Sequence, residues 1–165
     1  DGYFKSNDLV LLDSPWAVMG DDPFRGPTIR YSTLPQKVIF KHLKKINSNI
    51  MAIYVINFSL EDTLEWLEDN NYVIWKIIDV IHLTRRKKFR KSVGHFLQHS
   101  KDSLLIVKKI EVELNLNEQI IDVVLSREQV QSGKDNLVNL QLEFLFKNMT
   151  LEFKEIYARN NNHLW

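Results

Sequence analysis

Strands and helices alternate along this sequence, and this alternation limits the fold more than any other feature. Apolar runs at 9–12 and 51–56 suit strands that are buried on both faces, and apolar residues recur at helical spacing between them. Strand–helix–strand order is typical of a parallel sheet covered by helices. We therefore predict an α/β domain with a mostly parallel sheet and helices on both faces.

The remaining predicted elements continue the alternation. Ser59 is the expected N-cap of a helix that ends at Asn70-Asn71, because its hydroxyl can accept from the first backbone N–H groups. A helix at 137–147 is expected from the repeat of Leu137, Leu140 and Phe144. The further strands are predicted at 72–83, 104–112, 120–125 and 151–157, and a long loop rich in Gly and Pro at 17–32.

The length and composition of the chain limit its number of domains and the kinds of site and partner that it can have. A chain of 165 residues suits one compact domain, 1–165, and because it begins with Asp1 we expect it to be part of a longer protein. The absence of cysteine excludes disulfides and thiolate metal sites. The net charge of +1 means that any nucleic-acid contact must come from a local basic patch. No apolar run is long enough to cross a bilayer, so we expect no membrane partner.

The segment Asp13-Ser14-Pro15-Trp16 follows the first predicted strand directly. A carboxylate and the next main-chain carbonyl could together accept the hydrogens of an exocyclic amine, a proline would stiffen the turn, and an aromatic ring could stack on a base. The alternative is an ordinary strand-to-loop turn with an aromatic plug. On these four residues alone, the ordinary turn is favoured.

The order of several further motifs resembles the MT-A family of N6-adenine methyltransferases over nearly the whole chain. The matching pieces are Asp13-Ser14-Pro15-Trp16 for the family's Asp-Pro-Pro-Trp, Tyr31-Ser32-Thr33-Leu34, Gly94-His95-Phe96-Leu97-Gln98-His99 with Lys101, Ser132-Gly133-Lys134, and Tyr157-Ala158-Arg159 with Asn162 and Trp165. The resemblance implies a Rossmann-like, class I S-adenosylmethionine methyltransferase fold. It is closest to degenerate companion subunits such as those of ciliate DNA adenine methyltransferase complexes.

The resemblance also implies roles for individual residues. Asp13 would accept from the adenine amine with the Ser14 carbonyl, Pro15 would hold the turn, and Trp16 would flank the base. Lys134, Arg159 and Asn162 would surround S-adenosylmethionine. The interface or nucleic-acid surface would comprise Arg85, Arg86, Lys87, Lys88, Arg90, Lys91 and His95. A surface loop without a ligand is the alternative for this basic stretch. His95 and His99 lie four residues apart, but they lack a third ligand, so we predict no metal site.

Departures from the family pattern decide between two functions. Ser14 replaces a proline, Asp79-Val80-Ile81-His82-Leu83 stands where the family has Trp-x-Lys-x-Asn, and Asp135-Asn136 follow the Ser-x-Lys element in place of Pro and acidic residues. We therefore favour a non-catalytic subunit that supports a catalytic sibling in a nuclear heterodimer. In this interpretation the complex uses S-adenosylmethionine as its cofactor, but this chain does not bind it. Both subunits contact the nucleic acid, and further DNA-binding subunits can join the complex. The alternative is an active N6-adenine methyltransferase acting on DNA or RNA.

Overall fold

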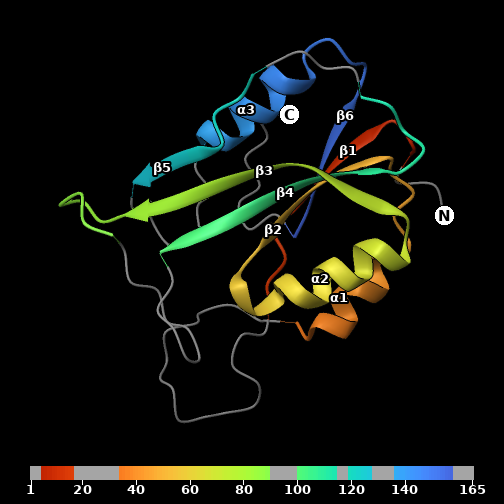
Figure 1. Cartoon of the computed structure of the whole chain (residues 1–165), viewed down its shortest axis with the longest axis horizontal. Helices are drawn as coiled ribbons and strands as arrows, with labels where there is room; N and C mark the ends of the chain where they lie inside the picture. Colours follow the sequence, from red (N-terminus) through yellow and green to blue (C-terminus); the bar gives the residue numbers. More distant parts are fainter. Residues whose placement is uncertain (1–4, 17–33, 90–99, 115–118, 128–135, 158–165) are drawn as a thin grey trace.

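The computed structural model describes residues 5–16, 34–89, 100–114, 119–127 and 136–157. Within these ranges the order of elements is that expected from the alternating pattern (Figure 1). The elements are β1 (Asp8–Leu12), α1 (Gln36–Leu43), β2 (Ile50–Val55), α2 (Asn57–Asp69), β3 (Tyr72–Leu83), β4 (Lys101–Lys109), β5 (Val123–Arg127), α3 (Asn136–Phe146) and β6 (Glu152–Ile156). The strands predicted at 104–112 and 120–125 are thus shifted by about three residues, which is the usual error at element boundaries.

The six strands form one sheet in the order β5-β3-β4-β2-β1-β6. Three of the five strand pairings are parallel, namely β1 with β2, β1 with β6, and β3 with β5. Strand β4 runs antiparallel to both of its neighbours, β2 and β3. The mostly parallel sheet is confirmed, whereas the reversed direction of β4 was not predicted.

Helices cover both faces of the sheet, as predicted. Side chains alternate along each central strand, so that Leu9 and Leu11 pack toward α3 while Val10 and Leu12 pack toward α1 and α2. Figure 1 shows α3 on one side of the sheet and the two other helices on the opposite side. Burial on both faces explains why β1 and β2 read as continuous apolar runs rather than as alternating ones.

Helix α3 buries a different face from the one that its apolar repeat indicated. Leu137, Leu140 and Phe144 are 50%, 49% and 45% exposed, and they form the outer face of the helix. The buried side chains are instead Val138, Leu142, Leu145 and Phe146. Because α3 is apolar on two faces, spacing alone could identify the helix but could not select the face that packs on the sheet.

Helix α2 begins two residues before the predicted cap. Ile56 is the N-cap residue and Ser59 is the third residue of the helix. The Ser59 hydroxyl accepts from the Ile56 backbone N–H at 3.3 Å and its side chain is buried, so it still satisfies a group at the helix start. The prediction that Ser59 is the N-cap was therefore wrong in position, although the residue does stabilise the helix terminus.

Replacing Ser59 with alanine should lower the free energy of unfolding by about 0.5–2 kcal/mol, because the Ile56 N–H would lose its side-chain acceptor. Urea denaturation followed by circular dichroism measures this difference. Glu61→Ala is the matched control, since Glu61 is exposed on the same helix. Equal stability of Ser59→Ala and the wild type would show that this hydrogen bond has no net effect.

A buried ion pair joins Asp8, at the amino end of β1, to Lys154 in the middle of β6. The Asp8 side chain has no exposed surface, and its Oδ2 accepts from Lys154 Nζ and from the Lys5 backbone N–H, each at 2.7 Å. Burial by itself raises the pKa of Asp8, but hydrogen bonds from Lys154 and Lys5 and the positive charges nearby bring the pKa below its ordinary value. Asp8 lies at the amino end of β1, whereas ligands in such sheets bind beyond the carboxyl ends of the strands. We therefore infer that this ion pair stabilises the fold and takes no part in a binding site.

No described helix combines the length and the apolar character needed to span a membrane.

Candidate functional site

The segment Asp13-Ser14-Pro15-Trp16, which we call the acidic turn, lies at the carboxyl end of β1, between the ends of β2 and β6. The Asp13 backbone N–H donates to the Ile156 carbonyl at 3.4 Å, which ties the turn to the last residue of β6. The Pro15 carbonyl accepts from the Leu34 N–H at 2.8 Å just before α1. In open α/β sheets ligands bind beyond the carboxyl ends of the strands. The turn therefore occupies the edge at which a ligand site is expected.

The turn itself is tightly closed. The Trp16 backbone N–H donates to the Ser14 carbonyl at 2.9 Å, which makes a three-residue turn centred on Pro15. The Ser14 carbonyl is the oxygen that the resemblance assigns to the adenine amine, so one of its two lone pairs is already used within the chain. Asp13, Ser14 and Trp16 are only 6%, 4% and 6% exposed. All three residues thus belong to the packed interior of this edge.

Trp16 lies in the hydrophobic core on the α1 and α2 side of the sheet. Its indole Nε1–H donates to the Tyr54 carbonyl at 3.1 Å, and its ring lies 5.9 Å from the ring of Phe40. These contacts hold the ring in place and bury most of its surface. The base-flanking role of Trp16 stays a prediction.

The Ser14 hydroxyl is buried and has no hydrogen-bond partner among the described residues. A proline at this position, as in the family motif, would place no polar atom here. A buried hydroxyl without a partner costs free energy, and each such group in a folded protein calls for an explanation. Ser14 therefore places an unsatisfied polar atom beside Asp13.

The residues predicted to surround a cofactor lie outside the described residues. These are Lys134, Arg159 and Asn162. Their proposed closeness to Asp13 stays a prediction. The loop at 17–32 also lies outside the described residues, as do Arg90, Lys91, His95 and His99.

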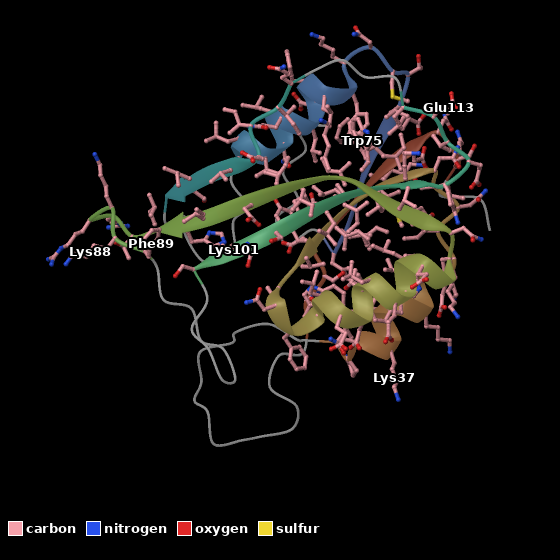
Figure 2. All side chains as sticks on the ribbon, viewed as in Figure 1. Lys37, Trp75, Lys88, Phe89, Lys101 and Glu113 are labelled. Atoms are coloured by element: carbon pink, nitrogen blue, oxygen red, sulfur yellow. The ribbon has the colours of Figure 1, made fainter. Side chains whose placement is uncertain are left out.

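The first half of the basic stretch forms a hairpin turn that extends β3 (Figure 2). Leu83 bridges to Phe89, the Thr84 N–H donates to the Lys88 carbonyl at 2.8 Å, and Lys87 has a φ of 58°. Its exposed cations are Arg85, Arg86, Lys87 and Lys88. Phe89 is 65% exposed, and Figure 2 shows Lys88 and Phe89 at the end of the projection. Within the described part of the chain, no ion pair joins these cations to an acidic side chain.

Two polar pairs that the sequence did not reveal occupy the carboxyl half of β3. Asp79 accepts from Lys101 Nζ at 2.8 Å and from Ser103 Oγ, while His82 Nε2 lies 3.0 Å from Asp102 Oδ2. Burial alone raises the pKa of Asp79, but its bonds to Lys101 and Ser103 bring that pKa below the ordinary value. This is the stretch where the family's Trp-x-Lys-x-Asn is missing. Cross-strand pairing could not be predicted because it depends on the antiparallel register of β4.

Metal ligands do not gather anywhere in the described ranges: no group of three or more His, Asp or Glu side chains there could hold a metal ion.

The strand order, the layers of helices and the turn at the carboxyl edge together define a class I S-adenosylmethionine methyltransferase fold. One solved structure with this fold is the crystal structure of the M1.HpyAVI–SAM complex, which matches with a TM-score of 0.57 and 14% sequence identity. The match covers 94% of this chain and 84% of that one. No protein-family profile and no curated protein sequence matches the chain. At this identity the likeness establishes the fold.

Proposed function

We propose that this chain is a non-catalytic, methyltransferase-like subunit of a heteromeric N6-adenine nucleic-acid methyltransferase. In this complex it stabilises a catalytic sibling of the MT-A type and contributes to the nucleic-acid surface. The observation that carries the proposal is the closed state of the acidic turn. Asp13 and Ser14 are more than nine-tenths buried, and the Ser14 carbonyl already accepts from Trp16.

A working adenine-N6 site would need an accessible carboxylate and carbonyl. The methyl group passes directly from the sulfonium to the amine nitrogen, so catalysis depends on holding that nitrogen in line and drawing on its hydrogens. A base must reach this point unpaired or flipped out of a duplex. The burial of Asp13 and Ser14 does not favour such an approach.

We propose that S-adenosylmethionine is the cofactor of the assembled complex. M1.HpyAVI, which shares the fold, was crystallised with SAM, and this supports a methyl donor as the cofactor of the assembly. The catalytic sibling would bind it. The residues of this chain that would face such a cofactor are Lys134, Arg159 and Asn162, and we propose that they do not hold it.

The basic hairpin supports the nucleic-acid role. Its exposed Arg and Lys side chains can each neutralise a phosphate, and such contacts add affinity that falls as salt concentration rises. The full predicted stretch, which continues through Arg90 and Lys91 to His95, would extend this surface.

The test compares matched substitutions in the assembled complex. Asp13→Ala in this chain should leave methyl transfer to adenine unchanged, whereas the corresponding Asp→Ala in the sibling should abolish it. Removal of this chain should strongly reduce the activity of the sibling. Titration calorimetry of the isolated chain with S-adenosylmethionine should give no binding heat. Micromolar binding, together with loss of activity in Asp13→Ala, would instead establish this chain as the active methyltransferase.

A further inference from the structure

Within the described ranges, part of the sheet has no helix over it on the face that α1 and α2 occupy. Helices α1 and α2 cover the strands from β4 to β1 on this face, whereas no described helix covers the half formed by β3 and β5, which we call the open half. The side chains that β3 and β5 direct to this face are Ile74, Ile77, Val123 and Leu125, which are 38–56% exposed. Their orientation follows from the register, because Ile77 lies opposite Leu105 of the buried cluster and Val123 lies opposite Asp79.

Helix α2 extends this apolar surface. Leu60 and Leu64 are 36% and 41% exposed. At 100° per residue they project from the edge of the buried stripe of α2 that lies away from Trp66, and the Trp66 ring stacks on Phe40 of α1. Leu60 and Leu64 therefore border the open half of the sheet. We call these six residues the apolar band: Leu60, Leu64, Ile74, Ile77, Val123 and Leu125.

The two ends of the apolar band carry opposite charges. Helix α2 contains five acidic residues and no basic one, and Glu61, Glu65 and Glu68 are exposed beside Leu64. The other end of the band leads along β3 to the hairpin, whose cations are Arg85 to Lys88 and which contains no acidic residue. Asp79 lies opposite Val123 beside the band, and its carboxylate is paired with Lys101.

We propose that the apolar band is the docking surface for a second copy of this chain. A two-fold axis through the band would bring the basic hairpin of one copy onto the acidic α2 of the other, twice. A two-fold interface must be complementary to itself, and a surface with an apolar centre, one acidic end and one basic end meets that requirement. Exposed apolar surface with a polar rim is typical of protein–protein interfaces.

This proposal concerns the described surface alone and does not rest on the proposed function. A hairpin that lies against α2 of a second copy is not free to bind phosphate, so nucleic acid bound by that hairpin would compete with self-association. The failure of self-association would leave the test of catalysis in the assembled complex untouched.

The first experiment measures the mass of the chain in solution by sedimentation over a range of protein concentrations. We expect a reversible dimer, weakened by salt because its rim is charged. Ile77→Asp should weaken the dimer at least about tenfold, since it places a charge at the centre of the interface. Leu140→Asp is the matched control, because Leu140 is equally exposed but lies on α3 at the opposite face of the sheet. It should leave the dimer unchanged.

The second experiment tests the pairing of charges. Glu61→Lys, Glu65→Lys and Glu68→Lys together change the net charge of α2 from −5 to +1, so both ends of the surface become basic. Arg85→Glu, Arg86→Glu and Lys88→Glu together change the net charge of the hairpin from +4 to −2, so both ends become acidic. Each triple variant alone should be monomeric at concentrations where the wild-type chain is dimeric. An equal mixture of the two should dimerise again, because each acidic end then meets a basic end.

A wild-type chain that stays monomeric at high concentration overturns the proposal. So does a dimer that is lost in Leu140→Asp but kept in Ile77→Asp. A mixture of the two charge variants that fails to associate overturns the two-fold arrangement. Circular dichroism of each variant shows that the fold is intact, and all substituted positions are exposed.

Discussion

Replacing Lys154 with methionine is expected to destabilise the folded chain by about 3–5 kcal/mol at neutral pH. The substitution keeps most of the side-chain volume but removes the positive charge that faces the fully buried Asp8. The carboxylate would keep the Lys5 N–H but lose its ion-pair partner, and an uncompensated buried charge is strongly unfavourable. Urea denaturation near pH 7 measures the loss.

The effect should depend on pH in a defined direction. Because the pKa of Asp8 in the folded chain lies below its ordinary value, the stability from this pair is present above the ordinary pKa. That stability is lost as pH falls through the folded-state pKa. The difference between Lys154→Met and the wild type should therefore shrink in acid.

The control for this pair is Glu152→Gln. Glu152 lies 3.7 Å from Lys154 Nζ but its side chain is 62% exposed, so its contribution should be about 0–1 kcal/mol. A loss of stability in Lys154→Met that is no larger than in Glu152→Gln would show that the buried pair does not stabilise the fold.

Replacing Leu142 with alanine should cost about 2–5 kcal/mol. Leu142 is fully buried where α3 packs on the sheet, so the substitution removes apolar contacts and leaves a cavity in the cluster that also contains Leu9 and Ile106. Thermal or urea unfolding measures the change. The size of the effect depends on how far the surrounding side chains close the cavity.

Leu140→Ala provides the comparison within the same helix. Leu140 is 49% exposed, and its replacement by alanine should change stability by about 0.5 kcal/mol or less. Similar losses at the two positions would contradict the packing of α3, because they would mean that the helix buries both faces. The pair thus tests which face of α3 packs on the sheet.

Much of the fold could be predicted from local patterns. The apolar runs at 9–12 and 51–56 identify β1 and β2, Pro35 lies just before α1, and Asn70-Asn71 ends α2. These signals depend on nearest neighbours and on the two periodicities of regular structure. The direction of β4 could not be predicted in this way, because it is set by contacts with β2 and β3 rather than by its own residues.

The candidate site was only partly within reach of the sequence. The position of Asp13 at the carboxyl end of a central strand followed from the strand pattern and the resemblance. The closure of the turn did not, since the hydrogen bonds from Trp16 to the Ser14 and Tyr54 carbonyls depend on backbone geometry and on packing against β2. The pairs Asp79–Lys101 and His82–Asp102 were missed for the same reason.

The pairing of β6 with β1 has a consequence for the folding of the chain during its synthesis. Asp8 pairs with Glu152, so residues that lie far apart in the sequence become immediate neighbours in the sheet. Such contacts form slowly, because a long loop must close first. While the ribosome is still adding α3, the free edge of β1 lacks its neighbour and can capture other strands. A chain synthesised only as far as α3 is thus exposed to aggregation along this edge, and β6 is the strand that protects the edge of β1.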